Sequence, residues 1–144
     1  MLRRYRARIS GPLLDRIDLH LEVPSLGVEE VIADKWEESS ESIRTRVIRA
    51  RAVQQDRFRE HLGIYCNAQM ATREIRRYCS LSESCANLLR TAVESLGLSA
   101  RAYDRILKVA RTLANLEGVD SLKERHVAEA IHYRSLDRKS NSTA

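Results

Sequence analysis

Residues that start and end helices recur along the sequence from residue 39 onwards. Five runs in which apolar residues return every three or four positions follow a serine or threonine, whose hydroxyl accepts a hydrogen bond from the first helical turn. These residues are Ser39 or Ser40, Thr72, Ser82, Ser99 and Ser121. Gly97 and Gly118 end two of the runs, because glycine adopts a left-handed φ angle without steric cost. The sequence therefore predicts a mainly α fold, in which five helices with short connections pack as a compact helical bundle.

The run from residue 100 to about 116 predicts a helix with two distinct faces. Its apolar face consists of Tyr103, Ile106, Leu107, Ala110 and Ala114. Arg101, Arg105 and Lys108 lie on the opposite face.

A long helix is predicted from residue 39 or 40 to about residue 62, followed by a loop over residues 63–71. The apolar stripe of this helix consists of Ile43, Val47, Ala50 and Phe58. A second arc carries Arg46, Arg49 and Arg57. For this arc we favour solvent exposure beside Glu and Asp neighbours over contact with DNA or with another subunit.

The segment of residues 10–24 changes its sequence period at Arg16. The residues before Arg16 suit a short helical turn. Apolar and polar residues alternate from Ile17 to Val23, which is typical of a β-strand. Arg16 thus lies at the junction of a turn and an orphan β-strand. A single strand leaves its backbone groups unpaired, so we expect residues 1–40 to be poorly anchored.

Charge and cysteine content narrow the classes of partner. The 144 residues carry a formal charge of +5, and 21 of the 25 basic residues are arginine, which suits pairing with phosphate or carboxylate. On charge alone, a solvated helical surface is the favoured interpretation. Three cysteines without CxxC spacing indicate a reduced, cytoplasmic protein, and no apolar run has membrane length. The four histidines lack ligand spacing, so we predict no metal site.

Arg101 is a candidate anion-binding residue on physical grounds. A cation in the first turn opposes the helix dipole, so helix stability does not favour arginine there. The same helix end offers free N–H groups to a phosphate. The alternative is a solvated arginine balanced by Asp104 or a nearby glutamate, and spacing alone favours that alternative.

Four motifs together resemble one family, the magnesium-chelatase-like AAA+ ATPases of the ComM/YifB group. They are LLDRID around Arg16, ESSESIRTRV at Glu38–Val47, SARAYDRILKVARTLA from Ser99 and EAIHYR at Glu129–Arg134. The resemblance implies that Arg16 is a catalytic arginine finger acting in trans on the ATP of a neighbouring subunit. It also implies that Arg101 is a sensor 2 residue at the γ-phosphate of ATP. Arg105 and Lys108 receive no role from it and are expected to be surface or interface charges.

The resemblance further implies that the chain is the C-terminal part of a longer protein. We expect residues 1–24 to be a remnant of the α/β core, 25–41 a linker, 42–136 the helical lid domain and 137–144 a disordered tail. The sequence contains no GxxxxGK[ST] loop and no acidic Walker B strand. ATP and Mg²⁺ are therefore expected as cofactors of the full-length ATPase, and neither is expected to bind this fragment alone.

The expected partners are neighbouring subunits of a homo-hexameric ring and, for the full-length protein, DNA, with no membrane. The favoured activity is DNA remodelling of the branch-migration type during competence or recombination. One alternative is a magnesium chelatase subunit. Another is a free-standing basic helical module that binds DNA or protein, which predicts salt-sensitive DNA binding by the fragment alone.

Overall fold

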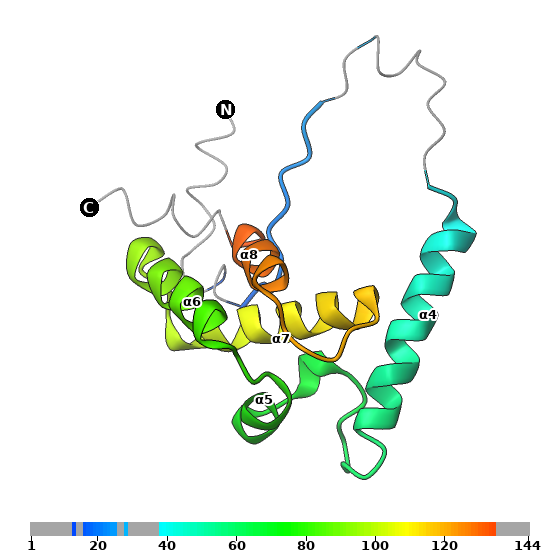
Figure 1. Cartoon of the computed structure of the whole chain (residues 1–144). Helices are drawn as coiled ribbons and strands as arrows, with labels where there is room; N and C mark the ends of the chain where they lie inside the picture. The colour runs from blue at the N-terminus through cyan, green and yellow to red at the C-terminus, as the bar shows by residue number, and fades with distance from the viewer. Residues whose placement is uncertain (1–12, 14–15, 26–27, 29–37, 135–144) are drawn as a thin grey trace.

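Helix α7 (Ala100–Glu117) lies at the centre of the structure, a computed structural model that describes residues 13, 16–25, 28 and 38–134 (Figure 1). It packs against three other α-helices and against a short 3₁₀ helix, and α6 packs on α8. The remaining elements are α4 (Ser40–Arg57), η1 (Asn67–Gln69), α5 (Thr72–Tyr78), α6 (Glu83–Leu96) and α8 (Glu124–His132). The described residues contain no β-strand. The prediction of a mainly α, compact helical bundle is confirmed.

Serine residues begin three of these helices, and glycine residues end two of them, as the sequence predicts. The side chains of Ser39, Ser82 and Ser99 accept hydrogen bonds from backbone N–H groups three residues later, at 3.1–3.3 Å. Gly97 and Gly118 have φ angles of 61° and 79° at the ends of α6 and α7. Capping of this kind typically stabilises a helix by about 1 kcal/mol.

Two helix starts differ from the prediction, because a side chain inside the helix caps the backbone. Ala71, and not Thr72, precedes α5, and its N–H donates to Glu74 Oε2 at 3.0 Å. Lys123, and not Ser121, precedes α8, and its N–H donates to His126 Nδ1 at 3.1 Å. Each helix therefore begins where the side chain of its third residue can accept a hydrogen bond from the N–H of the residue before the helix.

Helix α4 ends at Arg57, five residues before the predicted end. Phe58 leaves the helical conformation with φ −103° and ψ 9°. It is buried, and its ring packs edge-on against His61 and Tyr78, with centroids 5.8 and 5.6 Å away. Burial of the Phe58 ring thus decides where the helix stops, and the predicted loop that follows contains η1.

The buried side of α7 forms the centre of the hydrophobic core. Ile106, Leu107, Ala110 and Ala114 are buried as predicted, whereas Tyr103 is exposed. The core also includes Phe58, Met70, Ile75, Cys79, Cys85, Leu89, Leu122, Val127 and Ala130. Every α-helix except α4 contributes to this cluster from within its own bounds.

Only the second half of α4 is packed. Ala50 and Gln54 are its buried residues, whereas Ile43 and Val47 are 42% and 40% exposed. The predicted apolar stripe is therefore wrong for its first half. Figure 1 shows that half extending away from the other helices.

The predicted arginine arc of α4 is divided between two environments. Arg46 remains at the surface, where it pairs with Glu38. Arg57 is partly buried and its Nη1 donates to Asn67 Oδ1 and to Asn115 Oδ1, both at 2.9 Å. This contact joins α4, η1 and α7, and burial lowers the pKa of Arg57. The sequence prediction missed this structural role.

A second polar cluster fixes α8 against the end of α7. Arg111 is buried and donates to the backbone oxygens of Val119 and Asp120. Glu117 contacts His126 Nε2 and also pairs with Arg125. His126 Nδ1 accepts the N–H of Lys123, so the neutral ring carries its proton on Nε2.

Acid is expected to destabilise the fold through His126. Burial lowers its pKa, and the cations Arg125, Lys123 and Arg111 act in the same direction, while Glu129 and the carboxylate of Glu117 oppose the shift. A second proton would have to occupy Nδ1 and would break the α8 cap. The stabilisation is therefore complete above the unfolded value of about 6.5 and is lost as the pH falls below it.

The check is the melting temperature measured from pH 7.5 to pH 5.5. His126→Gln should remove part of the decrease seen in the unmodified chain, since glutamine does not titrate. His132→Gln, at an exposed position on the same helix, is the matched control and should keep the decrease. An unchanged pH profile in His126→Gln would contradict this role.

Candidate functional site

Arg16 lies in a turn and its side chain is exposed. The backbone N–H of Arg16 donates to the oxygen of Leu13 at 3.0 Å, which closes the turn. Arg16 makes no ion pair with any described residue. Asp18, the carboxylate that could have held it, pairs with Arg105. The guanidinium of Arg16 is therefore presented to solvent from a closed turn.

The N-terminal segment, residues 16–25, contacts the helical bundle directly. The N–H of His20 donates to the oxygen of Tyr133 at 2.8 Å, and Arg134 Nη1 donates to the oxygen of Ile17. Figure 1 shows this segment passing beside α8. Our expectation that residues 1–40 are poorly anchored is therefore wrong for residues 17–20, because polar groups at the end of α8 replace the missing strand partner.

The apolar residues of the N-terminal segment remain at the surface. Leu21 and Val23 are 67% and 87% exposed, and Ile17 and Leu19 are also exposed. No described residue forms a strand ladder with them. The expected strand is thus not assigned, although its alternating apolar side is available to a sheet. The predictions for residues 1–12, 14–15, 26–27, 29–37 and 135–144 lie outside the described residues.

Arg101 occupies the position predicted for it, in the first turn of α7. The Ser99 hydroxyl accepts the N–H of Ala102 at 3.1 Å and caps this turn. The Arg101 side chain is exposed, and within the described part of the chain it forms no ion pair, including none with Asp104. Of the alternative, a solvated arginine balanced by Asp104 or a nearby glutamate, the solvent exposure is observed, and the ion pair is absent among the described residues.

The two other cations on this face of α7 have structural contacts that the sequence prediction did not assign. Arg105 forms an ion pair with Asp18, and their side chains are 23% and 46% exposed. Lys108 Nζ donates to the backbone oxygen of Ala68 at 3.0 Å. Both were expected to be surface or interface charges. Each instead attaches another segment to α7.

These contacts bring the two candidate arginine segments together. Arg101 lies one helical turn before Arg105, and Arg16 lies two residues before Asp18. The Asp18–Arg105 ion pair therefore joins the turn that carries Arg16 to the helix that carries Arg101.

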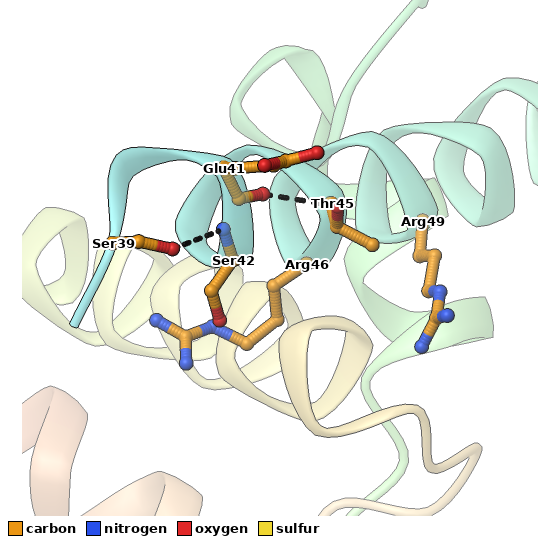
Figure 2. Close-up of a pocket in the computed structure, with 6 residues that line it drawn as sticks. All are labelled: Ser39, Glu41, Ser42, Thr45, Arg46 and Arg49. Carbon is orange, nitrogen blue, oxygen red and sulfur yellow. Dashed lines mark hydrogen bonds between the residues drawn. The ribbon is translucent and has the colours of Figure 1, made fainter.

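A shallow hollow at the start of α4 is a separate surface feature. Figure 2 shows its lining: Ser39, Glu41, Ser42, Thr45, Arg46 and Arg49. Glu38 accepts two bonds from Arg46, at 2.8 and 3.0 Å, and one from Ser42 at 2.7 Å. The Ser42 and Arg46 hydrogen bonds lower the pKa of Glu38. Glu38 and Glu41 offset the charges of Arg46 and Arg49, so this hollow has no excess positive charge to attract an anion.

Other reactive groups give no competing centre. Cys66, Cys79 and Cys85 are free, and burial raises the pKa of the Cys79 thiol to about 11. Among the described residues, no group of three or more His, Cys, Asp or Glu side chains is arranged to hold a metal ion. In the same part of the chain, no helix combines the length and apolarity needed to cross a bilayer.

Two family models match the chain and together cover both candidate arginines. The model of the C-terminal region of magnesium chelatase subunit ChlI matches residues 37–134, and that of subunit ChlI itself matches residues 1–31. The chain belongs to the magnesium-chelatase-like family. Arg16 falls within one family match and Arg101 within the other.

Individual relatives place this magnesium-chelatase-like chain in the ComM/YifB group. It is 42% identical over 137 residues to the competence protein ComM of Haemophilus influenzae. The aligned residues cover 94% of this chain and 26% of the relative. It is 43% identical to YifB of Salmonella typhimurium, also over 137 residues, which cover 94% of this chain and 26% of YifB. The chain thus spans about a quarter of the length of these relatives.

Proposed function

We propose that this chain supplies two arginines to the ATP sites of a ring-forming AAA+ ATPase. Arg16 is the arginine finger and acts on ATP held by the neighbouring subunit, and Arg101 is the sensor 2 residue. The observation that carries the proposal is that both arginines are exposed, lack ion pairs within the described part of the chain and stand on segments joined by one ion pair.

Phosphoryl transfer explains why arginine is the residue type at both positions. Negative charge develops on the γ-phosphate oxygens and on the bridging oxygen in the transition state. A planar guanidinium donates several hydrogen bonds to such oxygens and keeps its charge. Neither arginine has a carboxylate partner among the described residues, so both retain this capacity for an external phosphate.

The remaining parts of the ATP site belong to an upstream core in this proposal. The sequence lacks a GxxxxGK[ST] loop, so ATP and Mg²⁺ are held elsewhere in the full-length protein, by which we mean this chain with that core. We therefore expect no ATPase activity above background from the chain alone. The test compares ATP hydrolysis by the full-length protein and by the chain, and we expect hydrolysis only by the full-length protein. Hydrolysis by the chain alone would contradict the proposal that the upstream core holds ATP and Mg²⁺.

We further propose a homo-hexameric ring in the cytoplasm that remodels DNA. Support comes from the relative named competence protein ComM, since competence involves DNA. The free state of all three cysteines agrees with a reducing compartment. Magnesium insertion is the second candidate, favoured by the ChlI family models. Two assays of the full-length protein distinguish these candidates: branch migration of a four-way DNA junction and insertion of Mg²⁺ into a porphyrin.

The chain alone is expected to bind duplex DNA only weakly. Its exposed arginines are spread over several helices, and Arg46, Arg59 and Arg125 are paired with carboxylates. Titration of a labelled duplex at moderate salt should give a dissociation constant no tighter than about 10⁻⁶ M, the range of non-specific binding. Tighter, strongly salt-dependent binding would favour the free-standing module instead.

A further inference from the structure

Three polar contacts converge on the residues that follow Arg16. Arg105 from α7 pairs with Asp18, Arg134 donates to the oxygen of Ile17, and the oxygen of Tyr133 accepts the N–H of His20. They involve both backbone and side-chain groups, and they come from two different parts of the bundle. Ile17 and Asp18, the two residues immediately after Arg16, are therefore attached to the helical bundle.

These polar contacts, and not apolar burial, fix the N-terminal segment. Arg134 is fully buried at 0% exposure, and His20 is also buried. In contrast, the apolar side chains of the same segment are exposed, and exposure increases beyond His20. An ion pair that is partly withdrawn from water is screened less than one at the surface. The contacts with Arg105, Arg134 and Tyr133 thus hold this segment against the bundle.

We infer that Arg105 and Arg134 are positioning residues for Arg16. Arg105 cannot easily serve as a third phosphate ligand, because its guanidinium is committed to Asp18. Its effect passes through the backbone, from Asp18 to the turn closed by Leu13 and Arg16. Arg134 holds the residue directly after this turn, through the oxygen of Ile17.

This arrangement makes α7 a physical link between the two candidate arginines. Arg101 and Arg105 are one turn apart on one helix, so a rotation of α7 that moves Arg101 also moves Asp18 and the adjacent Arg16. Rigid helices transmit small displacements of this kind between sites. The inference rests on the proposed roles of Arg16 and Arg101 and adds their mechanical coupling.

The contact itself is tested in the chain as it stands, by amide hydrogen exchange. Arg105→Asp places two carboxylates together and should accelerate exchange of the His20 N–H at least about tenfold. Exchange across the core of α7 and α8 should stay unchanged, which excludes general unfolding. The charge-swapped pair, Asp18→Arg with Arg105→Asp, should restore slow exchange, and Arg105→Lys should restore part of it. Unchanged exchange at His20 in Arg105→Asp, or no recovery in the swapped pair, would overturn the inference.

The positioning role is tested in the full-length protein. Arg105→Asp should lower kcat at least about tenfold with an unchanged dissociation constant for ATP, and the swapped pair should recover kcat. If Arg16→Ala loses activity while Arg105→Asp keeps it, the positioning role is wrong and the arginine finger stands. If Arg16→Ala keeps activity, the proposed function itself is wrong, whatever the exchange measurement gives.

Discussion

Arg16→Ala in the full-length protein is expected to reduce ATP hydrolysis by about 10³- to 10⁵-fold, the effect of an arginine finger in related phosphoryl-transfer enzymes. ATP binding should persist, because the finger acts mainly on charge that develops in the transition state. Arg16 is exposed, and its side chain forms no ion pair with a described residue, so its removal breaks no ion pair in that part of the chain. Steady-state hydrolysis and equilibrium binding of ATP measure the two effects separately.

The control for this variant is Arg90→Ala. Arg90 is also an exposed arginine, and within the described part of the chain its side chain bonds only to Asn87 on its own helix. It lies on α6, whereas the contacts described above for residues 17, 18 and 20 come from α7 and from the end of α8. Hydrolysis at the unmodified rate in Arg16→Ala would contradict the finger, and an equal loss in Arg90→Ala would indicate a general charge effect.

Arg101→Ala is expected to lower ATP turnover on the order of 10²-fold, the loss seen when one donor to a developing charge is removed. The bundle should remain folded, since the Arg101 side chain is exposed and Ser99 still caps α7. Circular dichroism of the chain and hydrolysis by the full-length protein form the measurement.

Arg73→Ala is a closely matched control for Arg101→Ala. Arg73 is the second residue of α5, as Arg101 is the second residue of α7, and both side chains are exposed. The two substitutions therefore have similar effects on helix charge. Equal turnover in the two variants would show that Arg101 has no special relation to ATP.

Local signals allowed the helices to be predicted from the sequence. Ser39, Ser82 and Ser99 cap the helices that they were predicted to cap, because capping depends on residues only two or three positions away. The same dependence explains the failures at α5 and α8. There a glutamate and a histidine within the helix cap the backbone, and a search for hydroxyl residues does not find them.

Buried charged residues could not be predicted in this way. Arg57, Arg111 and Arg134 appear in the sequence as ordinary surface cations, yet Arg111 and Arg134 are buried and Arg57 is partly buried. Each donates to oxygens that belong to another segment of the chain. Only the folded arrangement brings those oxygens within reach, so no period in the sequence indicates it.

The candidate site was predicted residue by residue through the family motifs, and the contacts that hold it were not. Physical reasoning alone placed Arg101 in a first turn, and the structure agrees. Arg105 was expected to be a surface or interface charge, without an assigned partner. Its ion pair with Asp18 joins residues far apart in sequence, which no local pattern indicates.

The central claim, that Arg16 acts on the ATP of a neighbouring subunit, is tested most directly by mixing two inactive full-length variants. One lacks the P-loop lysine of the upstream core and the other carries Arg16→Ala. In mixed rings, some interfaces combine an intact P-loop with an intact Arg16, so we predict that part of the ATPase activity returns. Size and differential labels verify that the rings contain both variants. If such mixed rings remain inactive, action in trans is contradicted.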